Sequence, residues 1–133
     1  MIKALFLFVS VSILSFGAEP LWLTSLEEAK TLAKKENKDL ILMLTKEECD
    51  ACWYMKNIVF EDADVKHLIE NSFIGVILDV DVEEIPVEFH YIGTPTFYFM
   101  DAHGRKFGYR LDGASNIKDF RQKISTVLDK KKN

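Results

Sequence analysis

The chain has 133 residues, of which 48% are hydrophobic and 29% charged, and its formal net charge is -4. This length holds one domain with a single core, and the composition excludes a disordered chain and a multi-pass membrane protein. A slightly acidic chain is also a poor nucleic-acid binder, because such proteins present a basic surface to phosphates. We therefore expect one globular domain, a monomer that binds no nucleic acid.

The N-terminal residues differ in composition from the rest of the chain. Lys3 supplies one positive charge, residues 4–16 are apolar apart from serines, and small residues precede the peptide bond after Gly17. The apolar run is shorter than the roughly 20 residues of a membrane-spanning helix, and this combination is typical of a secretory signal peptide. We predict a cleaved signal peptide over 1–17 and a mature domain over 18–133. A buried first helix or an uncleaved membrane anchor is the alternative interpretation.

Apolar patterning after this segment predicts an alternation of helices and strands. Ser25 precedes Glu28 at the spacing of a capping box, which indicates a helix start. The apolar run 40–44, bounded by Asp39 and Thr45, is too short for a helix and predicts a strand buried on both faces. In chain order, the expected elements are a helix over 25–36, a strand over 40–44, a helix that begins near Cys49, a short helix over 64–70, a strand over 73–78, a hairpin of 96–100 and 106–111, and a helix capped by Ser115. This order is typical of a single α/β unit.

Both cysteines of the chain, Cys49 and Cys52, lie in the stretch KEECDAC. In small exported proteins an even number of cysteines usually forms structural disulfides. A bond between these two would close only a very short loop, however, and would restrict the unfolded chain little. The residues themselves therefore favour redox chemistry or metal binding over a structural staple.

The arrangement of elements around this motif resembles the thioredoxin fold. A buried strand leads into the two cysteines at a helix start, a second strand follows, and Thr94-Pro95 then opens a hairpin. Within that superfamily, CDAC with its continuation FEDADV is most similar to the C-terminal, periplasmic thioredoxin-like domain of the transmembrane thiol:disulfide interchange protein. The resemblance covers residues 21–129 and implies an α/β fold with a central mixed four-stranded sheet flanked by helices.

The same resemblance implies the roles of the site residues. Cys49, at the positive end of a helix macrodipole, is the expected nucleophile that attacks a client's disulfide, and Cys52 is the expected resolving thiol. Thr94, held by Pro95, is expected to pair its backbone with a client strand. The implied partners are disulfide-containing client proteins and a membrane protein that donates electrons. The implied location is the periplasm, and no cofactor is expected.

Two positions depart from the family pattern. Thioredoxin-like proteins commonly bury an acid six residues before the first cysteine, where this chain has Met43. The interchange-protein domain carries another acid where this chain has Lys56. The resemblance therefore does not define a proton acceptor for Cys52.

The acidic neighbours of the first cysteine, Glu48 and Asp50, favour a reductase, because negative charge beside a thiolate destabilises the dithiol form. An oxidase or isomerase of the same fold is the alternative. A zinc or copper site that combines the cysteines with His67, His90 or His103 is a further alternative, and a redox-inactive binding module is a third. We predict an exported thiol:disulfide oxidoreductase that reduces client proteins and holds no metal.

Overall fold

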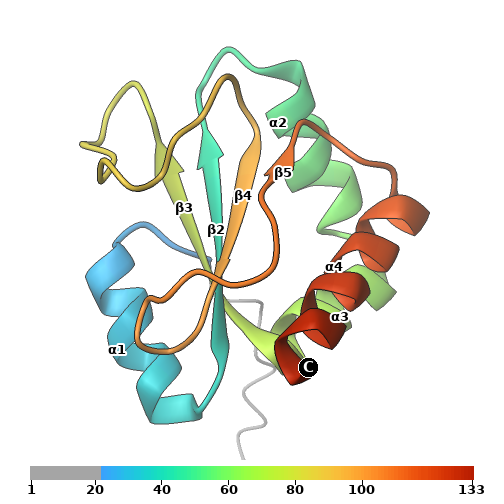
Figure 1. Cartoon of the computed structure of the whole chain (residues 1–133). Coiled ribbons are helices and arrows are strands. Elements are labelled where there is room, and N and C mark those ends of the chain that lie inside the picture. The colour runs from blue at the N-terminus through green and yellow to red at the C-terminus, as the bar shows by residue number, and fades with distance from the viewer. Residues whose placement is uncertain (1–21) are drawn as a thin grey trace, which may run out of the picture.

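The computed structural model describes residues 22–133. These residues form a mixed five-stranded sheet with the strand order β1-β3-β2-β4-β5 (Figure 1). The strands are β1 (Trp22–Leu23), β2 (Asp39–Thr45), β3 (Phe73–Asp79), β4 (Thr96–Met100) and β5 (Leu111–Asp112). β1, β3 and β2 are parallel, whereas β4 is antiparallel to β2 and β5 is antiparallel to β4. The predicted signal peptide, 1–17, lies outside the described residues.

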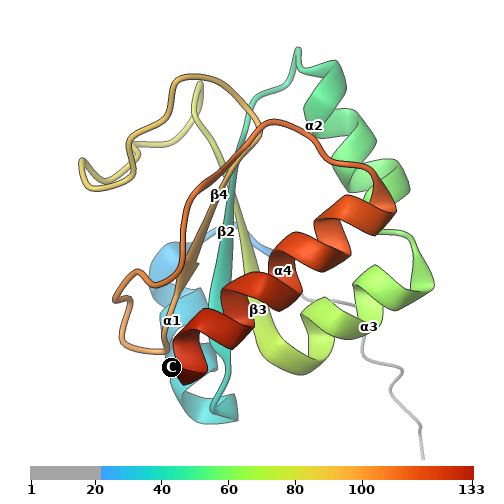
Figure 2. The same cartoon turned by 45° about the vertical axis from the view of Figure 1, so that its right-hand side comes forward.

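Helices cover both faces of the sheet (Figure 2). On one face lies α1 (Leu26–Glu36); on the other lie α2 (Asp50–Tyr54), the π-helix η1 (Met55–Val59), α3 (Ala63–Ser72) and α4 (Ile117–Lys132). Alternate residues of β2 belong to the two cores, with Leu42 on the α1 side and Met43 on the side of α2 and α4. A strand covered on both faces has no solvent-facing residues, which explains the apolar run 40–44. No helix within residues 22–133 has both the length and the apolar character needed to cross a membrane.

The sheet has one strand more than the four predicted. β1 pairs with β3 through Trp22 opposite Gly75, and a Cβ atom added at Gly75 would lie 2.5 Å from the Trp22 ring. The glycine leaves room for this indole, which stacks on Phe60 with 4.7 Å between the ring centroids. A two-residue strand has no periodic signal, so the sequence pattern could not indicate it.

The second strand of the predicted hairpin is shorter than expected. The sequence predicts a strand over 106–111, but only Leu111–Asp112 pair with β4 as a strand, and Lys106 makes an isolated bridge to Met100. Gly108, between these two points, has a φ of 70°, in the left-handed region that strands do not use. The prediction is therefore wrong over most of this segment.

Side-chain caps mark the starts of the long helices. The predicted cap of α1 is confirmed, since Ser25 Oγ accepts a hydrogen bond from the Glu28 N–H at 3.3 Å. The predicted cap of α4 is wrong by one residue. Asn116 Oδ1 accepts the Asp119 N–H at 2.8 Å, and the Ser115 hydroxyl instead accepts a hydrogen bond from a lysine of α4.

Candidate active site

The predicted site lies at the edge of the sheet where β2 and β3 end and β4 begins (Figure 1). The carboxyl ends of parallel strands meet at one edge of a sheet, and an antiparallel neighbour starts there. This topology brings segment 46–49, after β2, next to segment 93–95, before β4. The predicted site residues are therefore brought together although they are far apart in the sequence.

Cys49 is the N-cap residue of α2 and forms a disulfide with Cys52. Its backbone is extended, and its sulfur accepts a hydrogen bond from the Cys52 N–H at 3.1 Å. Cys52 is fully buried, whereas Cys49 is partly exposed. An incoming disulfide can therefore reach the Cys49 sulfur and not the Cys52 sulfur, as the predicted order of attack requires.

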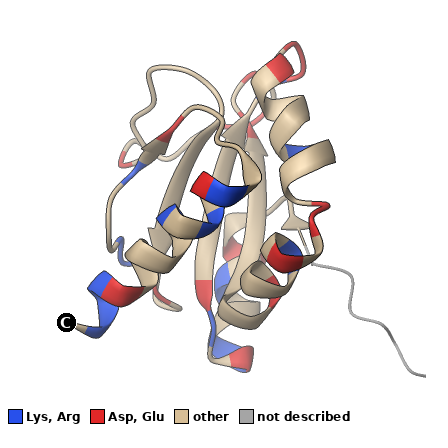
Figure 3. Cartoon of the chain, turned by 90° about the vertical axis from the view of Figure 1, so that its right-hand side faces the viewer, with Lys and Arg blue, Asp and Glu red and all other residues tan. Residues whose placement is uncertain are grey.

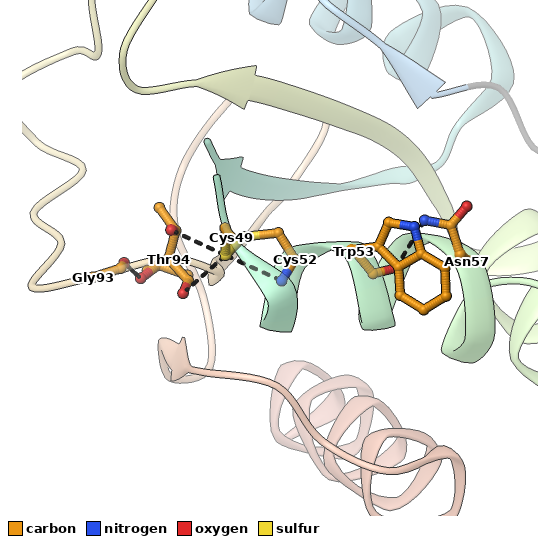
Figure 4. The surroundings of a disulfide bond; sticks show 7 residues. Cys49, Cys52, Trp53, Asn57, Gly93 and Thr94 are labelled. Atoms are coloured by element: carbon orange, nitrogen blue, oxygen red, sulfur yellow. Dashed lines mark hydrogen bonds between the residues drawn. A yellow bond between two sulfur atoms is a disulfide. The ribbon is translucent and has the colours of Figure 1, made fainter. Parts of the chain in front are cut away.

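Thr94 contacts the Cys49 sulfur through two of its atoms (Figure 4). The Thr94 hydroxyl donates to Cys49 Sγ at 3.4 Å, and the Thr94 carbonyl oxygen lies 3.5 Å from the same sulfur. The Thr94–Pro95 peptide bond is cis and Pro95 is buried. The segment is held on both sides, because the Thr96 hydroxyl donates to the Gly93 carbonyl at 2.8 Å and the Gly113 N–H, just after β5, donates to the Pro95 carbonyl at 2.8 Å.

The interior beneath the disulfide contains no carboxylate in the part of the chain that the structure describes. Met43 occupies the position of the family's buried acid, and it is fully buried in the same core cluster as Cys52. The buried polar side chains of residues 22–133 are Thr45 and Thr96. No buried acid from these residues can accept a proton from Cys52.

Thr45 is a site residue that the sequence pattern did not reveal. It ends β2 with 4% exposure, and its hydroxyl oxygen has no hydrogen-bond partner among residues 22–133. Thr45 lies on the same face of β2 as Met43. The last pair of β2 and β4 is Leu44 with Thr96, so the next residue of each strand segment places Thr45 opposite Pro95. A polar residue after an apolar run indicates a strand boundary, and only the packing shows that this hydroxyl is buried.

The histidines of the metal-site alternative lie on three separate segments. His67 is on α3, where it forms a hydrogen bond with Asn71 at 2.9 Å, while His90 lies between β3 and β4 and His103 follows β4. All three are exposed. Within residues 22–133 no three His, Cys, Asp or Glu side chains are grouped so that they could hold a metal ion. The described part of the chain thus offers no support for this alternative.

A mixed sheet between two helical layers, with a Cys-x-x-Cys disulfide at the start of α2, defines a thiol:disulfide oxidoreductase of the thioredoxin fold. The sequence model of the thioredoxin-like domain matches residues 26–128. The chain belongs to this family. Among curated proteins, none matches the chain significantly by sequence.

Solved structures of this fold superpose on most of the chain. A thioredoxin from Thermus thermophilus is 27% identical with a TM-score of 0.71, and the match covers 82% of this chain and 88% of that one. The DsbH oxidoreductase is 22% identical with a TM-score of 0.64, covering 84% of this chain and 87% of that one. The C-terminal domain of Neisseria meningitidis DsbD in its oxidised form is 16% identical with a TM-score of 0.64, covering 80% and 98% respectively. The last two likenesses concern the fold alone, and the predicted resemblance to the DsbD domain agrees with them at that level.

Proposed function

We propose that this oxidoreductase is an exported reductase, which transfers electrons to disulfides of periplasmic client proteins. The observation that carries the proposal is the asymmetry of the two sulfurs. Cys49 can be approached at the N-terminus of α2, and Cys52 is fully buried behind it. An accessible attacking thiol and a shielded resolving thiol suit a complete cycle of disulfide exchange.

Charges beside Cys49 support the direction of electron transfer. Glu47, Glu48 and Asp50 are exposed, and none of them forms an ion pair with another residue of 22–133. Negative charge that is not neutralised destabilises a nearby thiolate, and so disfavours the dithiol relative to the disulfide. A protein with this preference gives up its electrons readily once it is reduced.

The proposed cycle has two exchange steps. The Cys49 thiolate attacks one sulfur of the client's disulfide, forms a bond to it, and expels the other client sulfur as a thiolate that takes up a proton. Cys52 then loses its proton and attacks the Cys49 sulfur, which forms the Cys49–Cys52 disulfide and releases the first client sulfur as a second thiolate. The client gains the two electrons of this couple and the protein loses them.

Thr94 is proposed to orient the partners during the first step. Its hydroxyl donates a hydrogen bond to Cys49 Sγ, and its backbone, next to the cis peptide bond of Pro95, is proposed to pair with a client segment. After the second step a separate dithiol donor must reduce Cys49 and Cys52 again. We assign this step to a membrane protein, because the family resemblance implies one.

Reduction of insulin tests the reductase activity. With dithiothreitol as the electron source, we expect the mature chain 18–133 to accelerate insulin precipitation, and the Cys49→Ser variant to lose the acceleration. Alkylation of the starting protein controls for the presence of both free thiols. A protein with both thiols free and no acceleration would contradict the proposed activity.

Export is tested by cell fractionation of a bacterium that expresses the full chain. We expect the protein in the periplasmic fraction, with the mass of a chain that begins at Ala18. A control lacking residues 2–17 should remain in the cytoplasm. Full-length protein with an intact N-terminus in the cytoplasmic fraction would contradict export.

A further inference from the structure

Exposed large hydrophobic side chains gather on the loop between β3 and β4, residues 80–93, which we call the β3–β4 loop. Val82 is 80% exposed, Val87 87% and Ile92 88%, and Tyr91 is exposed as well. Outside this loop, large hydrophobics of the described chain are exposed only at Trp53 and Ile58, which lie on the helix after the cysteines. Clusters of exposed apolar side chains mark sites of interaction with other molecules.

Anchors hold the β3–β4 loop against the hairpin beneath it. The Tyr98 hydroxyl donates to the His90 carbonyl at 2.5 Å, and Arg110 donates to the same oxygen at 3.2 Å. Phe89 is buried and packs edge-to-face on Tyr98 with 5.1 Å between the ring centroids. Lys106 Nζ donates to the Glu88 carbonyl at 2.8 Å. Residues 88–90, next to Val87 and Tyr91, are therefore fixed, so a partner would not have to order this part of the loop on binding.

The loop surrounds a hollow and leads directly to the disulfide. The hollow measures about 420 Å³, and polar groups share its lining with apolar side chains. The lining residues are Val80, Glu83, Ile85, Pro86, Val87, Phe89, His90 and Tyr91. From its rim the chain continues through Ile92 and Gly93 to Thr94, whose hydroxyl contacts Cys49. A client segment that pairs with Thr94 and continues past Gly93 meets the exposed side chain of Ile92 next.

Acidic side chains are frequent in the two segments that follow β2 and β3, the first of which carries Cys49 and the second of which leads to Thr94. Segment 79–93 contains no Lys or Arg, and Lys46 is the single cation of segment 46–50. The acids of these two segments are Glu47, Glu48, Asp50, Asp79, Asp81, Glu83, Glu84 and Glu88, and none of them is in an ion pair within residues 22–133. Lys106 donates to the Glu88 carbonyl and brings one positive charge to the β3–β4 loop, whereas Arg110 is paired with Asp112 at 2.8 Å. One lysine does not balance the five acids of segment 79–93.

Basic side chains are spread over the molecule, and three consecutive ones lie in the last turn of α4. Figure 3 shows acidic positions in the loop before α2, whereas the blue positions of the last turn of α4, Lys130–Lys132, lie at the opposite end near the C-terminus. The active-site end is thus the more acidic end. A partner that docks beside the disulfide meets negative potential and exposed apolar surface together.

From this surface we infer the substrate class of the proposed reductase: clients whose disulfide is flanked by an extended segment carrying both Lys or Arg and large apolar side chains. The inference rests on the proposed function. The client's cationic side chains face the acids of segments 46–50 and 79–88. Its apolar side chains lie on Val87, on Ile92 and in the hollow. Charge complementarity of this kind raises the rate of encounter and weakens with salt.

Two synthetic peptides with the same disulfide provide the probe, one flanked by Lys and Leu and the other by Glu and Leu. We measure the rate at which each oxidises the reduced mature protein at low enzyme concentration. At about 20 mM salt we expect the basic peptide to react about tenfold faster, and at about 500 mM salt we expect the rates to converge. Equal rates at low salt, or a faster acidic peptide, would overturn the inference.

Matched variants locate the effect on the protein. Glu84→Gln with Glu88→Gln removes charge from the β3–β4 loop, and Glu28→Gln with Asp129→Asn removes the same charge far from the disulfide. We expect the first pair to reduce the preference for the basic peptide from about tenfold to about threefold, and the second pair to leave it unchanged. Equal effects of the two pairs would show that only net charge matters and would overturn the site assignment.

A second matched pair of variants tests the apolar side chains of the surface. We expect Ile92→Ser to slow reaction with the basic peptide about threefold or more and Ile58→Ser to leave it unchanged, since both side chains are exposed but only Ile92 adjoins Thr94. A second copy of the chain could also cover such a surface. Sedimentation of the reduced protein tests this alternative by measuring whether the chain forms dimers. Dimers broken by Ile92→Ser would overturn the assignment to clients.

An uncharged disulfide, bis(2-hydroxyethyl) disulfide, separates failure of the inference from failure of the reductase. If the protein reduces this compound but does not discriminate between the peptides, the reductase chemistry stands and the inference about clients is wrong. If it reduces neither this compound nor the peptides, the proposed function fails and the inference fails with it.

Discussion

The sulfur atoms of Cys49 and Cys52 differ in their surroundings as well as in their exposure to solvent. Cys49 Sγ receives hydrogen bonds from the Cys52 N–H and the Thr94 hydroxyl. Cys52 lies in an apolar cluster with Met43 and Met55. Hydrogen-bond donors stabilise a thiolate and apolar surroundings disfavour it, so Cys49 is the thiol that should ionise and attack first.

Single cysteine variants test this order. We expect Cys52→Ser to accumulate mixed disulfides with client proteins, because Cys49 can attack but nothing releases the client. Cys49→Ser should capture none, because Cys52 is buried. Non-reducing electrophoresis followed by mass spectrometry measures the adducts. Capture by Cys49→Ser alone would reverse the two roles.

The two buried threonines provide a second test at this scale. The Thr45 hydroxyl is buried without a partner among residues 22–133, whereas the Thr96 hydroxyl donates to the Gly93 carbonyl at 2.8 Å. A buried hydroxyl without a partner is destabilising, and a bonded one is stabilising. We expect Thr45→Val to raise the free energy of unfolding by about 1 kcal/mol and Thr96→Val to lower it by about 1 kcal/mol.

Urea unfolding of the oxidised protein measures both changes, with wild-type protein as the reference. The two substitutions are the same, so their difference reports the hydrogen bond rather than the shape of the side chain. A loss of stability in Thr45→Val as large as that in Thr96→Val would contradict this account of Thr45, and would indicate that a buried water occupies the site.

At the scale of elements, one contact joins the helix that follows the cysteines to the loop before α4. The helix of the cysteines widens into the π-helix η1, where the Phe60 N–H donates to the Met55 carbonyl at 2.9 Å. Turns of this kind are rare and occur often at functional sites. The Met55 sulfur in turn contacts the Ser115 N–H at 3.4 Å. The loop before α4 is therefore tied to the helix that carries Cys52.

Asn116, which caps α4, can be tested by substitution. We expect Asn116→Ala to lower the free energy of unfolding by about 1 kcal/mol, because the Asp119 N–H loses its acceptor at 2.8 Å. Ser115→Ala is the control, since the Ser115 hydroxyl accepts only from the Lys123 ammonium at 2.7 Å. Urea unfolding should show the smaller loss for Ser115→Ala. The opposite order would support the cap at Ser115 that the sequence predicts.

At the scale of the whole molecule, negative charge gathers at the active-site end, and this should influence the redox potential. Glu47, Glu48 and Asp50 are close to Cys49 in sequence and exposed, whereas the three C-terminal lysines of α4 lie at the other end. The charge acts on the thiolate that the reduced form carries, and not on the neutral disulfide. The reduced form should therefore be the less stable of the two.

We accordingly expect a reduction potential nearer to the roughly -270 mV of thioredoxin than to the roughly -120 mV of the strongest oxidant of this fold. Replacing Glu48 by Gln and Asp50 by Asn should raise the potential by about 15 mV, because the thiolate becomes easier to form. Equilibration against a dithiothreitol couple, with free thiols counted by alkylation, gives both values. A wild-type potential above about -150 mV would indicate an oxidase or isomerase.

Local features of the sequence sufficed for most of the fold and for the core of the site. The apolar run 40–44 predicts the buried strand, Ser25 predicts the start of α1, and the spacing of Cys49 and Cys52 predicts a redox pair at a helix start. Each of these signals depends on residues that are neighbours along the chain. The thioredoxin-like family of the chain followed from the same signals, together with Thr94-Pro95.

Contacts between distant segments decided the rest. The two-residue strand β1 depends on the space that Gly75 leaves for Trp22. The Thr45 hydroxyl is buried although it ends an apolar run at the edge of the sheet, where Thr45 pairs with Asp79 of β3. The contact of Thr94 with the Cys49 sulfur likewise joins residues that are remote in the chain but within hydrogen-bond distance in space. Periodicity and motif spacing record which residues tend to be buried, but burial of a particular atom depends on packing that no local pattern contains.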